Sequence, residues 1–208
     1  MATGLSRAGF LRRGAVGGGA LLVSAAGLPG LAHVASAAGA VDAAAPPPDS
    51  DLAYLRLLIA AELLAVDFQT TALASGKLRH GAKSLVRRIR SDETAHYKNL
   101  ASAMVAAGQI PATSGDIDFS YPKGSFRSQA SILRLAERVE RVMVGAYLGA
   151  VENVETAALR LPIGQIAANE AQHGSALAAL EGRPLVGQAF APALTMGAVS
   201  DVLDQFES

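Results

Sequence analysis

The sequence contains no cysteine and no tryptophan, and aromatic residues make up only 5% of its 208 residues. The lack of cysteine excludes disulfide bonds, thiolate metal ligands and an anchor attached through a lipidated cysteine. Net charge is lacking as well, because 18 basic and 18 acidic side chains cancel to a formal charge of zero. A nucleic-acid-binding domain usually carries a strongly basic surface, so this balance argues against nucleic acid as a partner.

What the chain has in abundance is apolar, helix-forming residues. Half of its residues are hydrophobic, alanine and leucine dominate, and runs of β-branched residues are short. Alanine and leucine are strong helix formers, whereas strands favour β-branched and aromatic residues. The composition therefore predicts an all-α protein, and the length allows one domain with an extension.

The first 37 residues read as an export signal. Basic side chains at Arg7, Arg12 and Arg13 precede an apolar run rich in glycine and alanine over residues 14–31. The small residues Ala35-Ser36-Ala37 then form a cleavage site of the kind that ends a signal peptide. We expect export across the cytoplasmic membrane, to the periplasm, the cell envelope or the medium.

The stretch Ser6-Arg-Ala-Gly-Phe-Leu-Arg-Arg13 resembles a twin-arginine signal and has a true arginine pair at Arg12-Arg13. This resemblance would make the twin-arginine export machinery a partner. Ala8 departs from that pattern, since it stands where the second arginine ahead of the Phe10-Leu11 pair is expected. The alternative is an uncleaved anchor helix, but the apolar run is rich in glycine and falls short of the roughly 20 strongly apolar residues that a span needs. Residues 38–50 are predicted to form a linker, and 51–208 the folded domain.

Two short stretches share one pattern, Glu93-Thr-Ala-His96 and Glu170-Ala-Gln-His173. Residues three apart lie on one face of a helix, so each stretch presents a carboxylate and an imidazole together. Glu62 lies 31 positions before Glu93, and Glu140 lies 30 positions before Glu170. This duplication predicts two helix pairs forming a four-helix bundle, with six inward-facing ligands around two metal ions.

Hydrophobic periodicity predicts where the helices lie. The connection over residues 108–124 can extend to about 56–61 Å, whereas a 28-residue second helix is about 42 Å long. The connection can therefore cross the whole bundle, which gives one long crossover between the second and third helices. Asp49 and Ser50 are candidate N-caps of the first helix. The predicted helices cover residues 51–74, 80–107, 125–151 and 156–180, with a short helix at 198–206.

Pro162 falls within the fourth predicted helix and has two interpretations. It either kinks the helix or marks a later start in the first turn. We favour the kink, because only an early start places Glu140 and Glu170 equally far from the turn between the third and fourth helices.

The six candidate ligands lie on otherwise apolar helix stripes. An ionised glutamate in such a place is costly unless a cation or another partner satisfies it. The basic residues lie elsewhere: they flank the stripe of the second helix or lie off the stripe of the third. Four carboxylates and two imidazoles suit two Fe ions, or Mn ions, and Zn would tolerate the same ligands. The basic residues in question are Arg87, Arg88, Arg90, Arg134, Arg138 and Arg141.

Alternatives remain open at several positions. Both Glu-x-x-His pairs could be ordinary surface pairs, and Glu62 could be a cap or surface residue. Glu137 and Glu152 compete with Glu140 as the ligand from the third helix, although the arginines around Glu137 indicate a solvated face. Tyr147, two turns after Glu140, could line the site or fill the core. The two other histidines are His80, expected to be exposed at a helix start, and His33, in the signal.

The ligand series resembles that of the ferritin-like superfamily, over residues 51–208. Three further segments resemble its exported, desiccation-related bacterial branch: Gly145-Ala-Tyr-Leu-Gly149, Asn169-Glu-Ala-Gln-His173 and Phe190-Ala-Pro-Ala193. The resemblance implies a ferritin-like four-helix bundle with a di-metal carboxylate site. The same six ligands serve ferroxidase, peroxidase, catalase and oxygenase chemistry, so the resemblance does not select the reaction.

Two functions of different kinds fit this reading. In the first, an exported di-iron or di-manganese protein oxidises Fe(II) or consumes peroxide under oxidative stress, with dioxygen or peroxide as the partner. In the second, a non-catalytic envelope protein uses the metal for structure or sequestration during stress. Cage-type storage fits less well, because no long fifth helix follows Gly182. Many bundles of this kind dimerise, so a homodimer is a further expectation.

Overall fold

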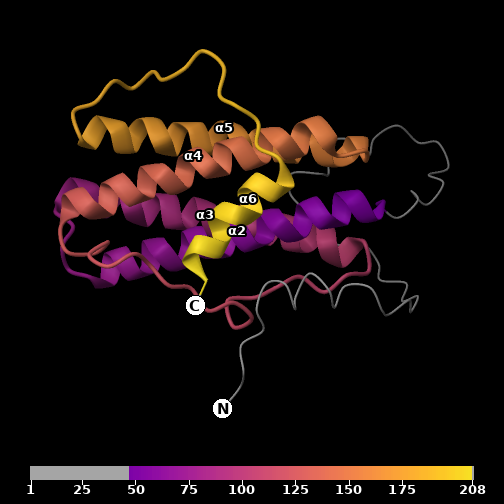
Figure 1. The fold of residues 1–208 in the computed structure, drawn as a ribbon, viewed down its shortest axis with the longest axis horizontal. Coiled ribbons are helices and arrows are strands. Elements are labelled where there is room, and N and C mark those ends of the chain that lie inside the picture. The colour runs from indigo at the N-terminus through magenta and orange to yellow at the C-terminus, as the bar shows by residue number, and fades with distance from the viewer. Residues whose placement is uncertain (1–46, 208) are drawn as a thin grey trace.

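The computed structural model describes residues 47–207, so the expected signal peptide and most of the predicted linker lie outside the described residues. Four long helices lie side by side, and a short helix, α6, crosses α2 and α4 (Figure 1). The prediction of an all-α four-helix bundle is confirmed. The helices are α2 (Asp49–Ala74), α3 (His80–Ala106), α4 (Gln129–Asn153), α5 (Ala157–Leu180) and α6 (Met196–Leu203), followed by the 3-10 helix η1 (Asp204–Phe206).

The long helices form two hairpins joined by one long crossover. The α2–α3 turn follows Ser75, and Gly76 adopts a positive φ of 69°, which glycine tolerates without strain. The α4–α5 turn consists of residues 154–156 alone. The backbone N–H of Arg79 donates to Gln129 Oε1 at 2.9 Å, so α4 begins beside the start of α3. Residues 107–128 therefore run the length of the bundle, as predicted.

Three predicted helix starts need correction, and the short helix α6 begins at Met196, two residues before its predicted start. The third helix was expected from residue 125 but begins at Gln129, because Ser128 and Ser131 form a reciprocal capping box. The first helix begins two residues early, with Pro48 as its N-cap, so Asp49 lies in the first turn and is not the cap. There its carboxylate still complements the positive end of the helix dipole.

Pro162 is the sixth residue of α5, and the helix continues to Leu180. The early start of this helix is therefore confirmed. Only the first N–H groups of a helix have no partner within it, so a proline in the second turn removes one intrahelical hydrogen bond, and α5 continues in spite of that loss.

The apolar core consists of two clusters that lie on either side of the middle of the bundle. One contains residues such as Leu100 on α3 and Ala167 on α5, and the other contains Ile89 on α3 and Leu177 on α5. Along both helices the Glu-x-x-His segments lie between these positions. Such packing keeps the centre of the bundle away from bulk water.

α2 is buried on most of its surface because α6 covers the face that the other long helices leave free. Among the described residues it is also the one helix long and apolar enough to cross a membrane. Its apolar window is 67% buried inside the bundle, however, and a core helix of a soluble domain passes the same test.

The segment before α6 docks in a groove made by two glycines of α4. The N–H of Leu194 donates to the carbonyl of Gly145 at 2.8 Å. A Cβ added at Gly149 would lie 2.0 Å from the Leu194 carbonyl oxygen, so this position has no room for a side chain. These two glycines belong to the segment that suggested the bacterial branch, and here they permit close backbone contact.

Replacing Gly149 by alanine is expected to displace the Leu194 segment and to lower the free energy of unfolding by about 1–3 kcal/mol, the usual cost of overpacking. Gly164→Ala is the matched control, because its added Cβ would meet nothing closer than Val151 Cγ2 at 3.9 Å. The control removes a helical glycine and is expected to be neutral or to stabilise by up to about 1 kcal/mol. Urea unfolding of both variants measures the difference, and equal stability would contradict the docking argument.

Candidate metal centre

The structure brings all six predicted residues together in the middle of the bundle, from four different helices. Their ligand atoms form two overlapping groups, and within each group these atoms lie within 4.8 Å of one another. Both groups include Glu93 from α3 and Glu170 from α5. The His96 group adds Glu62 and His96, and the His173 group adds Glu140 and His173.

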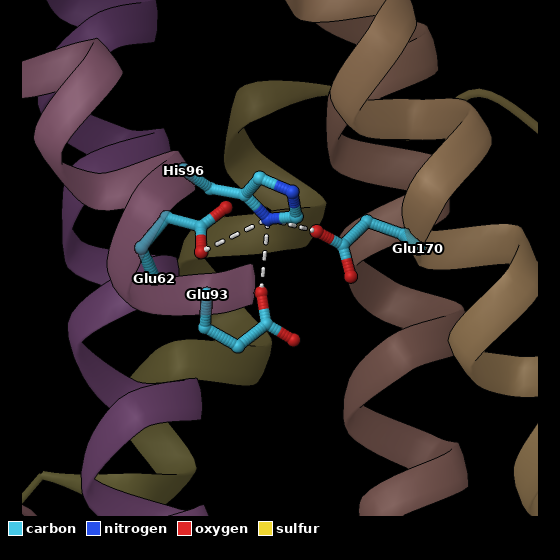
Figure 2. Close-up of side chains that lie close together, drawn as sticks. All are labelled: Glu62, Glu93, His96 and Glu170. Carbon is cyan, nitrogen blue, oxygen red and sulfur yellow. Dashed lines mark hydrogen bonds and ion pairs between the residues drawn. The ribbon is translucent and has the colours of Figure 1, made fainter. Parts of the chain in front are cut away.

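In the His96 group, three carboxylates converge on one imidazole nitrogen (Figure 2). His96 Nδ1 lies 2.9 Å from Glu170 Oε1, 3.1 Å from Glu93 Oε2 and 3.8 Å from Glu62 Oε2. The carboxylates come from α2, α3 and α5, so this group requires both hairpins. The side chain of His96 is 12% exposed, the most of the six.

The His173 group repeats this arrangement. His173 Nδ1 lies 3.2 Å from Glu170 Oε2, 3.3 Å from Glu93 Oε1 and 3.5 Å from Glu140 Oε2. The two imidazole rings are 6.1 Å apart between their centroids. Glu93 and Glu170 each turn one oxygen towards each histidine, so they connect the two groups.

The donor atoms fit divalent metal ions. All four glutamates are at most 1% exposed. Several of their oxygens accept no hydrogen bond of good geometry, a costly arrangement unless a cation approaches them. Carboxylate oxygens and imidazole nitrogens are ligands that Fe, Mn and Zn share. The unsatisfied oxygens are Glu62 Oε2, Glu93 Oε1, Glu140 Oε1, Glu140 Oε2 and Glu170 Oε1.

The two imidazoles supply positive charge when no metal does. Burial alone would lower the pKa of His96, but the carboxylates of Glu170 and Glu93, which accept from its protonated ring, outweigh burial and raise this pKa from 6.5 to about 9. Burial opposes the charge of His173 in the same way, and Glu140, Glu170 and Glu93 together raise its pKa well above the usual value. A metal ion bound here must displace these protons, which couples metal binding to pH.

The glutamates respond to burial and to one another. Burial raises the pKa of Glu62 and of Glu140 well above the usual value, and the charge of Glu93 adds to the effect in both. Burial acts in the same direction on Glu170, but its hydrogen bonds to His173 and His96 outweigh burial and lower its pKa to about 2. Glu170 is therefore the carboxylate that the imidazolium groups keep ionised.

The metal-free protein is expected to lose stability as the pH rises from 6.5 to 9. The folded pKa of His96 lies above its unfolded value, so its contribution is complete below pH 6.5 and disappears as the pH passes 9. The raised pKa values of Glu62 and Glu140 act in the same direction from lower pH. Urea midpoints in chelator across this range measure the decline. His96→Ala should reduce the decline without abolishing it, because the raised pKa values of His173, Glu62 and Glu140 remain. Exposed His80→Ala should leave the decline unchanged, and a flat profile for the unmodified chain would contradict the argument.

Tyr147 both fills the core and takes part in the site, which combines the two alternatives left open by the sequence. It is fully buried, and its hydroxyl donates a hydrogen bond to Glu62 Oε1. Burial and the charge of Glu62 raise the pKa of this phenol, so it remains a hydrogen-bond donor. Tyr147 therefore orients Glu62 from the opposite hairpin.

Asp92 is a residue of the site that the sequence reasoning missed. Its Oδ2 lies 3.4 Å from His173 Nε2 and 2.9 Å from the Nε of Arg88. The sequence position of Asp92 could have indicated this role, because Asp92 directly precedes Glu93 of the Glu-x-x-His stretch. The contact itself joins α3 to α5, and helix periodicity alone does not reveal contacts between helices.

The competing glutamates lie outside the centre. Glu137 forms ion pairs with Arg141 and Arg183, which lower its pKa. Glu152 is exposed near the end of α4, and His80 is exposed at the start of α3. Among these alternatives, Glu140 is the carboxylate of α4 that reaches the other ligands.

The fold and the site together are those of a helical bundle with a buried carboxylate and histidine cluster that could bind metal ions. The model of the ferritin-like domain family matches residues 50–183, which is more than half of the chain. The chain therefore belongs to the ferritin-like domain family. No curated protein matches the sequence.

Proposed function

We propose that this chain is a di-metal carboxylate protein of the cell envelope that oxidises Fe(II) or consumes peroxide. The observation that carries the proposal is the pair of ligand groups, which share Glu93 and Glu170 and lie between two apolar clusters. The His96 group would hold one metal ion, with Glu62 and His96 as its own ligands. The His173 group would hold the other, with Glu140 and His173 as its own ligands. Iron is the metal we favour, with manganese as the alternative.

A pair of redox-active ions supplies electron transfer to or from dioxygen or peroxide. With Fe(II) as the electron donor, hydrogen peroxide would take two electrons and two protons and would form two molecules of water. The protein contributes ligand exchange and a dry environment: the carboxylates can alter how they bind as the metal charge changes, and the apolar clusters exclude water. Tyr147 holds Glu62 in place while its other oxygen stays available.

Export is part of the proposal and rests on the pattern of residues 1–37, with the twin-arginine machinery as a partner. That route carries folded proteins, which suits a protein loaded with metal before it crosses the membrane. Assembly as a homodimer is proposed as well, and the mass of the mature chain in solution tests it.

The test is the metal content of the mature chain, purified without added metal, beside the His96→Ala/His173→Ala variant. We expect about two Fe or Mn per chain in the unmodified protein and none in the variant. Fe(II) oxidation by dioxygen and by peroxide is then measured on both. A folded protein that takes up no metal when Fe(II) is offered would contradict the proposal.

The same experiment distinguishes the non-catalytic alternative. The four glutamates are almost completely buried, and such a closed centre also suits structural or sequestering use of the metal. A catalytic site should show turnover that is lost in the double variant. A structural or sequestering site should bind metal, lose thermal stability in the variant and show no turnover in either protein.

A further inference from the structure

The two halves of the duplicated site differ in the residues outside the ligand set that can contact the histidines. Each histidine uses Nδ1 towards the shared glutamates, which leaves Nε2 available for a second contact. Corresponding residues precede the two Glu-x-x-His stretches: Asp92 in α3 and Asn169 in α5. The difference between these two residues makes the histidine environments unequal.

Asp92 holds His173 by an ion-paired carboxylate. Its Oδ2 lies 3.4 Å from His173 Nε2, and the Nε of Arg88 donates to the same oxygen at 2.9 Å. A carboxylate that accepts the Nε2–H of a histidine leaves the Nδ1 lone pair for a metal, fixes the ring and makes it a stronger ligand. His173 is therefore oriented for coordination before any ion arrives.

His96 has no equivalent partner. Within residues 47–207, the side chain of Asn169 makes no hydrogen bond and nothing hydrogen-bonds to His96 Nε2. His96 is also more exposed than His173, at 12% against 6% of the side chain. Its ring is therefore positioned through Nδ1 alone, by the carboxylates of Glu62, Glu93 and Glu170.

Glu62 and Glu140, the glutamates that belong to one group each, also differ in how many oxygens they can offer to a metal ion. Glu62 uses one oxygen to accept the hydrogen bond of Tyr147, so its capacity towards a cation is reduced. Neither oxygen of Glu140 accepts a hydrogen bond of good geometry from the part of the chain that the structure describes. Glu140 therefore offers two oxygens to an ion in the His173 group, while Glu62 offers one in the His96 group.

We propose that the two metal positions are unequal, and that the His173 group binds a divalent cation first and more tightly, with Asp92 as its positioning residue. The inference rests on the proposed di-metal function and specifies the order in which that site fills. A residue that hydrogen-bonds to a metal-bound histidine typically changes the affinity for the metal by about 10–100-fold. We therefore expect two binding steps whose dissociation constants differ by at least that factor.

Calorimetric titration of the metal-free chain with Mn²⁺ tests the order of filling. We expect a tight and a weak step of one equivalent each, and we expect Asp92→Asn to weaken the tight step by about 10–100-fold. Asn169→Ala is the matched control in the other half and is expected to change neither step. Circular dichroism confirms that both variants are folded.

Anomalous diffraction from crystals grown with one equivalent of Mn²⁺ then locates the first ion. A peak at the His173 group supports the inference. Two identical steps, a peak at the His96 group, or a tight step that is unchanged in Asp92→Asn would each overturn it while leaving the di-metal function intact. Failure to bind Mn²⁺ or Fe²⁺ at all would instead overturn the proposed function.

Discussion

Replacing Glu93 by alanine is expected to weaken both metal-binding steps, by at least about 100-fold each. Glu93 directs Oε2 to His96 and Oε1 to His173, so it belongs to both ligand groups. Loss of a direct ligand costs more than the 10–100-fold that an outer partner contributes. Glu62→Ala, by contrast, removes a residue of the His96 group alone and is expected to weaken one step. Calorimetry with Mn²⁺ measures both steps in each variant.

Glu137→Ala is the matched control for this series. Glu137 is one turn from Glu140 on α4, but it pairs with Arg141 and Arg183 on the surface and contacts no ligand. Its removal should leave both metal-binding steps unchanged. A Glu93→Ala protein that retains two ions, or a Glu137→Ala protein that loses one, would show that the assigned ligand groups are wrong.

Replacing Glu140 by leucine is expected to stabilise the metal-free protein by about 1–4 kcal/mol, as is often found when buried charged groups are replaced by apolar ones of similar size. The Glu140 carboxylate is 1% exposed, burial raises its pKa, and no hydrogen bond of good geometry satisfies it. The apolar residues Val139 and Met143 lie on the same buried side of α4 and can pack against the new side chain.

Metal should reverse this order of stability. A metal ion at 1,000 times its Kd stabilises the folded protein by about 4 kcal/mol, and the leucine variant lacks a ligand of the His173 group. Urea unfolding in chelator and in excess Mn²⁺ measures both conditions. A leucine variant that is less stable than the unmodified chain in chelator would mean that Glu140 contributes to the fold without metal.

The four long helices and the six converging side chains could be predicted from the sequence because both depend on helix periodicity. Glu93 and His96 lie three residues apart on a stripe that also carries Ile89 and Leu100, so burial of that stripe also buries the pair. The nearly equal spacings, 31 positions from Glu62 to Glu93 and 30 from Glu140 to Glu170, then placed all six at one level of the bundle.

The details that could not be predicted depend on contacts between elements distant in sequence. The carboxylate of Asp51 accepts hydrogen bonds from the backbone N–H groups of Glu155 and Thr156, 104 and 105 residues away. The contact of Asp92 with His173 spans 81 residues in the same way. The start of α4 at Gln129 was missed for a local reason, because the Ser128–Ser131 capping box has serine where glutamate or glutamine is usual.

The distribution of ligands over two hairpins determines when, during synthesis, the chain becomes able to take up metal. Each ligand group includes Glu170, which lies in the last long helix. A nascent chain that has released only α2 and α3 carries Glu62, Glu93 and His96 but completes neither group. Metal uptake therefore depends on docking of the second hairpin, and a bound ion marks a chain whose bundle has closed.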